Sequence, residues 1–483
     1  MGPVTRGRTW DLLVIGGGTA GIVAATTAAA LGARVLLTER ERTGGDCLWT
    51  GCVPSKALLA SASAAAEARA ASRLGVDVSG VTVDFVRVVL HVKQAIAEIE
   101  PVDSPDALRA AGVTVLAGDT VLTGPDTARI GNREVRFRAA VIATGAAPLV
   151  PPIPGLADVA PLTSETVWDL TELPRRLAVL GGGPIGCELG QAFARLGSQV
   201  TVVDGADRLL SVEDDEASRV VTAALVADGV DVRVGSEVVA VHGGRLELSD
   251  GSTALFDRVL VAVGRRPRTA DLGCAAAGVE LDDDGTVRVD GALRSTNRRI
   301  WAAGDVTGHP RFTHVAGVHG SLAASNAVLG LHRRIDPVVP RVTYTSPEVA
   351  TVGIGPAEAA GAGLLVRRTP HTDVDRAVAE GATGGSTALV HDRRGRLHGA
   401  TVIGPRAGET LGELGLAVRR GLRLRDLAGT THAYPTYNDG VSNGAVADVR
   451  ARLRRPAARL ALRSFVRLRG LWTDRREVQR SAR

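Results

Sequence analysis

Cysteine and aromatic residues are scarce in this chain of 483 residues. Only 4 cysteines occur, and Phe, Trp and Tyr together make up 3% of the sequence. A small secreted scaffold held together by disulfides would carry more cysteines in a shorter chain, so we expect the reducing cytoplasm as the compartment. In that compartment a close pair of cysteines is more often catalytic or metal-binding than structural.

One uncharged stretch, between Asp11 and Arg34, imitates a membrane segment because it is long enough to cross a bilayer. Its glycines, however, fall in a phosphate-binding pattern. We therefore interpret the stretch as part of a nucleotide-binding unit and not as a membrane span or a signal peptide.

The formal net charge of +5 is unevenly distributed. From Asp448 to the end, arginines greatly outnumber acidic residues, and the rest of the chain is close to neutral. The basic character therefore belongs to the tail, and nucleic acid is not an expected partner.

The first Gly-rich turn, Gly16-Gly17-Gly18-Thr19-Ala20-Gly21, follows a short apolar strand and opens an Ala-rich helix. Gly16 permits a tight turn, Gly18 lets a pyrophosphate approach backbone N–H groups, and Gly21 allows close packing of helix against strand. Glu39 ends the next strand and is placed to accept hydrogen bonds from an adenosine ribose. The segment predicts a dinucleotide-binding βαβ unit.

A second turn, Gly181-Gly182-Gly183-Pro184-Ile185-Gly186, repeats this pattern, and Gly181, Gly183 and Gly186 take the same three roles. Asp204 follows the next strand. An acid there suits a free 2′-hydroxyl, so NADH is favoured over NADPH, although Arg208 lies near enough to meet a 2′-phosphate. Beyond about residue 341, strand-like and helical segments mix without such a turn. We predict an α/β protein with two Rossmann-like dinucleotide-binding domains and a C-terminal α+β domain.

The segment 44–56, GGDCLWTGCVPSK, holds two cysteines five positions apart. Such positions in a regular helix differ by about 7.5 Å of axial rise, whereas a disulfide needs Cα atoms closer than about 7 Å. Cys47 and Cys52 therefore cannot bond inside an undistorted helix, but Gly51 allows a small loop to close. Pro54 suits the first turn of a following helix, whose N-terminus lowers the pKa of a nearby thiol. A zinc site would need further ligands at metal spacing, and none lies close in sequence, so no bound metal is expected.

Together with the two glycine motifs, segment 44–56 resembles the active-site signature of the class I pyridine nucleotide-disulfide oxidoreductases. This family includes dihydrolipoamide dehydrogenase, glutathione reductase and mercuric reductase. Three further motifs agree in order and spacing: Ala143-Thr144-Gly145 and Ala303-Gly304-Asp305 resemble the two loops at the flavin, and Gly264-Arg265-Arg266-Pro267 resembles the loop that closes the nicotinamide domain. The resemblance implies a homodimeric flavoprotein that uses FAD, with NAD(H) preferred and NADP(H) as the alternative.

The resemblance also implies domain boundaries and residue roles. An FAD-binding domain would comprise residues 1–150 and 290–340, an NAD(P)-binding domain 151–289, a dimerisation domain 341–449 and an Arg-rich tail 450–483. Cys52 would lie next to the flavin, Cys47 would exchange with the acceptor, and Lys56 would pair with Glu188 near the flavin. The residues implied to bind the cofactors are Gly16, Gly18, Gly21, Glu39, Gly45, Thr144, Gly145, Gly181, Gly183, Gly186, Asp204, Gly264, Arg265, Gly304 and Asp305.

A last motif, His432-Ala433-Tyr434-Pro435-Thr436-Tyr437-Asn438-Asp439, departs from the dithiol-handling members. In those members a His base directly precedes the Pro and a Glu follows, with the segment reaching the partner subunit's site. Tyr434 and Asp439 hold those positions here. A phenol with a pKa near 10 is a poor base at neutral pH, but it can donate a hydrogen bond or help to hold a metal ion. His432 is a candidate substitute base, although in an extended segment it would lie about 7 Å from position 434.

Segments 190–198 and 99–104 resemble mercuric reductase-like proteins, but no Cys follows Cys274 and no Cys pair precedes Trp10. We predict a reductase of a small-molecule or metal-ion electron acceptor, namely a metal ion or another soft electrophile. The alternative is a dihydrolipoamide dehydrogenase-type enzyme that exchanges dithiol and disulfide. A third hypothesis is a redox sensor whose output is the Arg-rich tail.

The tail predicts a basic amphipathic helix. Its apolar stripe comprises Leu453, Ala457, Leu460, Ala461, Leu468, Leu471 and Trp472. Arg459, Arg463 and Arg467 form a row beside the stripe. Such a helix either makes weak contact with an anionic membrane surface or docks on the protein body, and docking is the outcome that we expect.

Overall fold

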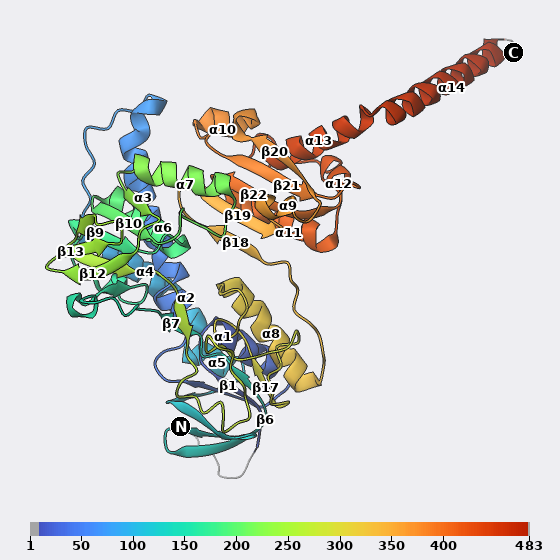
Figure 1. The fold of residues 1–483 in the computed structure, drawn as a ribbon. Coiled ribbons are helices and arrows are strands. Elements are labelled where there is room, and N and C mark those ends of the chain that lie inside the picture. Colours follow the sequence, from blue (N-terminus) through green and yellow to red (C-terminus); the bar gives the residue numbers. More distant parts are fainter. Residues whose placement is uncertain (1–8, 482–483) are drawn as a thin grey trace. The chain divides into compact units, whose positions relative to one another are not determined.

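The computed structural model describes the backbone of residues 9–481 and the side chains of residues 9–473. Residues 1–8 of the predicted first domain, and the side chains of residues 474–483 of the tail, lie outside the described part. The chain divides into two compact units (Figure 1). The first unit contains the residues up to Ser211 together with Val221–Val339, and the second contains Val212–Val220 and the residues from Pro340 onwards.

The first sheet of the first unit is built from short apolar strands that are buried on both faces, as is typical of parallel sheets. Its parallel strands follow the order β3-β2-β1-β6, and β17 also runs parallel to β6. Strands β4 and β5 extend the sheet in antiparallel fashion. The strands are β1 Trp10–Ile15, β2 Val35–Glu39, β3 Thr114–Ala117, β4 Thr120–Gly124, β5 Thr127–Ile130, β6 Arg133–Ile142 and β17 Ile300–Ala302.

Two helices with small side chains, α1 (Thr19–Ala30) and α8 (Thr313–Leu329), pack closely on each other and on this sheet (Figure 1). A Cβ atom at Gly320 would lie 2.2 Å from the carbonyl oxygen of Ala20, so only glycine permits the approach. This contact fixes the middle of α8 beside the beginning of α1, which follows the first Gly-rich turn.

A second parallel sheet repeats the arrangement with the strand order β11-β10-β9-β15-β8. Its strands are β8 Leu162–Thr163, β9 Arg176–Leu180, β10 Gln199–Asp204, β11 Asp231–Val234 and β15 Arg258–Val261. A three-stranded antiparallel sheet (β12 Val238–His242, β13 Arg245–Leu248, β14 Thr253–Leu255) and a strand pair (β7 Ala146–Pro148, β16 Arg265–Pro267) complete the strands. The other helices of this part are α2 Gly45–Trp49, α3 Cys52–Ala70, α4 Phe85–Asp103, α5 Pro105–Ala110 and α6 Pro184–Leu196. Helix α7 (Asp215–Ala227) begins among the residues of the second unit and ends among those of the first.

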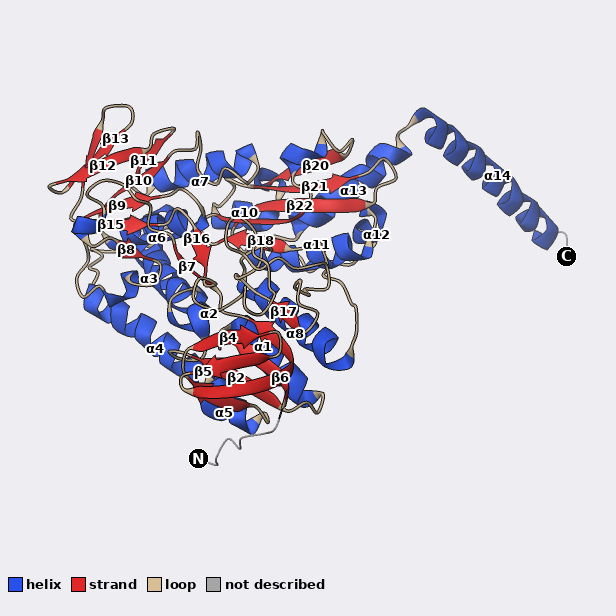
Figure 2. Cartoon of the chain, turned by 60° about the horizontal axis from the view of Figure 1, so that its bottom comes forward, coloured by secondary structure: helices blue, strands red, loops and turns tan. Residues whose placement is uncertain are grey.

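The second unit holds an antiparallel sheet of order β18-β19-β22-β21-β20, whose strands lie side by side in Figure 2. The strands are β18 Pro340–Thr343, β19 Glu348–Gly353, β20 Leu365–Pro370, β21 Ser386–His391 and β22 Leu397–Gly404. The helices are α9 Pro356–Ala359, α10 Asp375–Glu380, α11 Ala407–Arg420, α12 Leu424–Ala428, α13 Asp439–Leu453 and α14 Pro456–Ser481. The predicted fold class, α/β with a C-terminal α+β part, is confirmed.

The expectation that the tail docks on the protein body is wrong. Helix α14 forms as predicted, but its large apolar side chains are exposed, with 64% of Phe465 and 68% of Trp472 accessible. In the described residues no helix combines the length and the apolar character that a membrane crossing requires.

Candidate active site

The two cysteines of segment 44–56 occupy a break between two helices, as the spacing argument requires. Cys47 lies in α2, and Cys52 is the first residue of α3. Between the helices, a Cβ atom at Gly51 would lie 2.7 Å from the carbonyl oxygen of Asp46. The absence of a side chain at Gly51 therefore allows the chain to fold back and bring the cysteines together.

The two thiols are free and hydrogen-bonded to each other. The hydrogen bond from Cys47, followed by one with Thr313 and the charge of Lys56, lowers the pKa of Cys52 to about 6. The Cys52 sulfur lies 3.3 Å from the hydroxyl oxygen of Thr313, at the beginning of α8. The same Cys47–Cys52 hydrogen bond, together with burial, raises the pKa of Cys47. The pair therefore consists of an inner thiolate at Cys52 and a protonated thiol at Cys47.

Lys56 lies one helical turn after Cys52, and its Nζ donates to Glu188 Oε2 at 2.8 Å. Glu188 belongs to α6 and is buried, so the ion pair connects the redox helix with the helix that follows the second Gly-rich turn. The ammonium stabilises negative charge on Cys52, while the carboxylate opposes it.

The two Gly-rich turns have nearly the same geometry. Gly16 and Gly181 each adopt φ +107°, in the region that disfavours other residues. The backbone N–H of Gly17 donates to Glu39 at 2.6 Å, and that of Gly182 donates to Asp204 at 2.5 Å. Each of the two acids thus lies directly beside its turn.

The space in front of the two following helices suits a pyrophosphate. A Cβ atom at Gly183 would meet no atom within 4 Å, and one at Gly18 would meet only the Cα atom of Gly45 at 3.7 Å. Backbone N–H groups at such open helix N-termini bind phosphate. The residues present therefore fit two dinucleotides, one at each turn.

The remaining predicted cofactor residues cluster around one arginine. Arg265 forms an ion pair with Asp46, next to Cys47, and lies 3.7 Å from the Asp305 carboxylate. Burial raises the pKa of Asp305, which follows Gly304 in the loop after β17. The Nε atom of Arg265 is buried without a hydrogen-bond partner in the described residues, which leaves a donor for a bound polar group.

Thr144, Gly145 and Gly264 belong to the two loops beside this arginine. The hydroxyl of Thr144 donates to the carbonyl oxygen of Arg268 at 2.8 Å. Cβ atoms at Gly145 and Gly264 would meet no atom within 4 Å, so space lies open in front of both. Sequence reasoning missed Asp46, Arg268 and Thr313, since no motif spacing singles them out.

The three predicted residues of the last motif, Tyr434, Asp439 and His432, lie in the second unit. The Tyr434 hydroxyl donates to Asp375 Oδ2 at 2.5 Å, and Tyr434 is 71% exposed. Asp439, expected in the Glu position, is buried and accepts from the backbone N–H of Thr436 at 3.3 Å. Asp375 raises the pKa of Tyr434, so its phenol is a still poorer base.

His432 is held through both ring nitrogens. Its Nε2 lies 2.9 Å from Glu413 Oε1, and its Nδ1 lies 3.1 Å from the carbonyl oxygen of Thr430. A histidine oriented by a carboxylate is also the arrangement of a general base. The geometry is therefore compatible with the structural role and with the catalytic role.

Family models match most of the chain. The model of the pyridine nucleotide-disulphide oxidoreductases matches residues 10–320, and that of their dimerisation domain matches residues 339–445. Among similar proteins, the dihydrolipoyl dehydrogenase of Chlamydia pneumoniae is 35% identical over 455 residues, covering 91% of this chain and 97% of the relative. The mercuric reductase of Bacillus cereus is 35% identical over 446 residues, covering 89% of this chain and 70% of the relative.

Two solved structures are similar to this chain over most of its length. LpdA from Mycobacterium tuberculosis superimposes with a TM-score of 0.83 at 28% identity, covering 90% of this chain and 99% of that one. A Cu(II) complex of the HOCl-induced flavoprotein disulfide reductase RclA from Escherichia coli superimposes with a TM-score of 0.81 at 27% identity, covering 91% and 100%.

Proposed function

The chain belongs to the pyridine nucleotide-disulphide oxidoreductase family, and from that premise we propose that its Cys47–Cys52 pair delivers electrons to a metal ion or another soft electrophile. Membership makes it a flavin-dependent oxidoreductase that uses FAD and a nicotinamide cofactor, and it carries the family's dimerisation domain. The acceptor and the individual residue roles form the proposal.

The first Gly-rich turn, Arg265 and Asp305 would hold an FAD, which would supply the cysteine pair with two electrons received as hydride from the nicotinamide. Two electrons and one proton convert the disulfide into a thiol at Cys47 and a thiolate at Cys52. Cys52, with a pKa of about 6, carries negative charge at neutral pH, and Lys56 stabilises that charge. Cys47 would present its thiol to the acceptor. The pair returns to the disulfide by giving two electrons to the acceptor and releasing the one proton of the Cys47 thiol.

The observation that carries the acceptor class is the Tyr434–Asp375 hydrogen bond of 2.5 Å. An acceptor that leaves as a dithiol needs a base or acid near its thiols, and a phenol of raised pKa serves poorly as a base at neutral pH. A metal ion accepts electrons without proton transfer. The Cu(II) complex of the RclA relative and the mercuric reductase relatives support the same class.

The second candidate is a dihydrolipoyl dehydrogenase-type activity. The contact of 2.9 Å between His432 and Glu413 favours it, since it supplies a base oriented by a carboxylate. Relatives of that name are as similar to the chain as the mercuric reductases are.

The two candidates separate in steady-state assays. The FAD-loaded enzyme is given NADH and, in turn, Hg(II), Cu(II), lipoamide and glutathione disulfide. We expect turnover of a metal ion to exceed that of both disulfides and to disappear in Cys52→Ser. Faster turnover of lipoamide, abolished in His432→Ala but kept in Tyr434→Phe, would establish the alternative. Slow turnover with every acceptor would reject both and favour the redox sensor.

We propose NADH as the preferred donor. Asp204 also accepts the backbone N–H of Ala206 at 2.7 Å, so its carboxylate is held at the end of β10 beside the second turn. The guanidinium of Arg208 donates to the carbonyl oxygen of Ser211 at 2.9 Å, within its own loop. An acid held in this way favours a ribose hydroxyl over a phosphate.

A further inference from the structure

Helix α14 exposes its apolar side chains to an unusual degree. Five large side chains on one side of it are 59% to 69% accessible, namely Leu460, Phe465, Leu468, Leu471 and Trp472. Monomeric soluble proteins rarely leave so many large apolar groups together on their surface, and such a group marks an interaction site. We call these five residues the apolar face.

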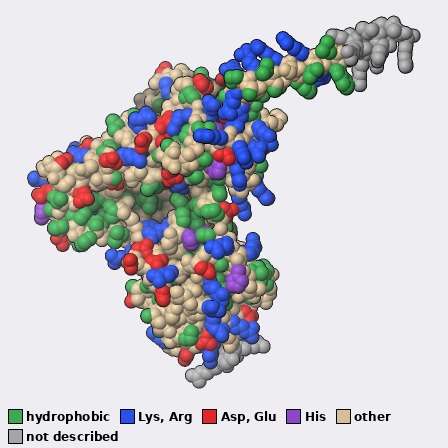
Figure 3. Space-filling view, turned by 45° about the vertical axis from the view of Figure 1, so that its right-hand side comes forward, with side chains coloured by type: hydrophobic (Ala, Val, Ile, Leu, Met, Phe, Trp, Pro, Cys, Tyr) green, Lys and Arg blue, Asp and Glu red, His purple; other side chains and the backbone are tan. Residues whose placement is uncertain are grey.

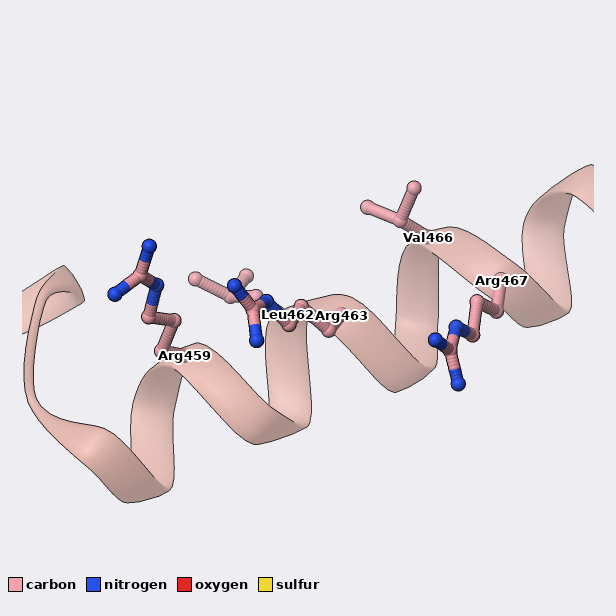
Figure 4. Close-up of a pocket in the computed structure, with 5 residues that line it drawn as sticks. All are labelled: Arg459, Leu462, Arg463, Val466 and Arg467. Carbon is pink, nitrogen blue, oxygen red and sulfur yellow. The ribbon is translucent and has the colours of Figure 1, made fainter.

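A row of arginines lies beside the apolar face, and the exposed Leu462 and Val466 lie among them. Arg459, Arg463 and Arg467 follow one another at intervals of one turn, and together with Leu462 and Val466 they line a shallow groove along the helix (Figure 4). Between Pro456 and Thr473 the sequence contains no acidic residue. Figure 3 shows basic and hydrophobic side chains side by side along this helix.

A partner that satisfies both the arginine row and the apolar face must combine negative charge with an apolar layer. A bilayer with anionic lipids does so, because the long arginine side chains reach the headgroups while the adjoining apolar face enters the acyl boundary. Trp472 and Phe465 are side chains that interfacial helices commonly bury there.

A second copy of α14 is a less suitable partner for the apolar face than a bilayer is. A coiled-coil seam repeats every seven residues, and here the row that contains Ala457 and Leu471 is interrupted by Ser464. Pairing two such helices would also bring together segments that each carry four arginines and no acid between Pro456 and Thr473.

We propose that α14 is a membrane-surface helix that binds bilayers containing anionic lipid and so recruits the enzyme to them. The family models end at residue 445, before this helix begins, so the proposal stands independently of the acceptor.

Vesicle flotation of the full, FAD-loaded chain tests the proposal. The vesicles contain phosphatidylglycerol and phosphatidylcholine in equal parts, or phosphatidylcholine alone. We expect binding to the anionic vesicles only, weakened as salt rises toward about 1 M, where the screening length is about 3 Å.

Two sets of variants separate charge from apolar burial. Arg459→Gln/Arg463→Gln/Arg467→Gln should weaken binding about a hundredfold, at about fivefold for each arginine near an anionic surface. Phe465→Ser/Trp472→Ser should weaken it about tenfold or more.

The matched control makes the same change of net charge elsewhere. Arg133→Gln/Arg258→Gln/Arg298→Gln replaces three exposed arginines of the first unit and should leave binding unchanged. Unchanged NADH oxidation by every variant shows that the body is folded. Equal binding to neutral vesicles, equal losses in the control, or unchanged binding after deletion of residues 456–483 would overturn the proposal. A dimer that falls apart on that deletion would identify a second copy as the occupant instead.

Discussion

Thr313→Val is the change that tests the electrostatics of the cysteine pair most specifically. Valine keeps the shape of threonine and removes only the hydroxyl, which lies 3.3 Å from the Cys52 sulfur. That contact is one of the causes that lower the pKa of Cys52 to about 6. The contact with Thr313 lowers the pKa of Cys52 less than the hydrogen bond from Cys47 does. Its removal should therefore raise this pKa only part of the way to its usual value.

The size of the effect follows from the contact. A hydrogen bond to a charged group contributes about 1.5–3 kcal/mol, and a long bond to sulfur lies at the low end. At 1.36 kcal/mol per pKa unit, the loss raises the pKa of Cys52 by about one unit, from about 6 to about 7. At pH 6 the thiolate fraction then falls from about one half to about one tenth.

The assay is the pH dependence of alkylation of the reduced enzyme, with the modified residue identified by mass spectrometry. Alkylation of Cys52 at pH 6 should slow about fivefold, because only the thiolate reacts. The control is Thr50→Val, the same change in the loop between the two cysteines. The hydroxyl of Thr50 lies 3.5 Å from the carbonyl oxygen of Asp46. An unchanged or lowered midpoint in Thr313→Val, or an equal shift in the control, would refute the reasoning.

Three further changes test other parts of the site. Gly51→Ala places a Cβ atom 2.7 Å from a carbonyl oxygen, so it should lower the free energy of unfolding by about 1–3 kcal/mol in urea titrations. The control Thr50→Ala should leave the free energy of unfolding unchanged. Glu188→Gln removes the negative charge that pairs with the partly exposed Lys56 and should cost about 1 kcal/mol in the same titration, because solvent screens that ammonium. Asp204→Asn should lower kcat/KM for NADH about tenfold without a matching loss for NADPH; equal losses for both cofactors would reject the role of Asp204 in selectivity.

The sequence was sufficient for those parts of the fold that local patterns determine. The strands that precede and follow the glycine turns are buried apolar runs, and Glu39 and Asp204 lie beside their turns because the βαβ geometry fixes that distance. The break at the redox loop was predictable as well, since Cys47 and Cys52 cannot form a disulfide inside one undistorted helix.

Contacts between distant segments could not be read in this way. Asp375 lies 59 residues before Tyr434, and nothing in the spacing distinguishes it from Asp439 as the partner of the phenol. Thr313 reaches Cys52 from 261 residues away because α8 packs on α1. The prediction that α14 docks on the protein body failed because an amphipathic pattern indicates which face of a helix is apolar but not which surface covers that face.

The most direct measurement is a count of alkylated cysteines in denatured enzyme before and after anaerobic reduction with NADH. Of the 4 cysteines, the account predicts that the air-oxidised enzyme is labelled at Cys187 and Cys274 alone, and that Cys47 and Cys52 gain label after reduction. Labelling of Cys47 and Cys52 before reduction, or no gain of label after it, would contradict the claim that this pair carries the electrons.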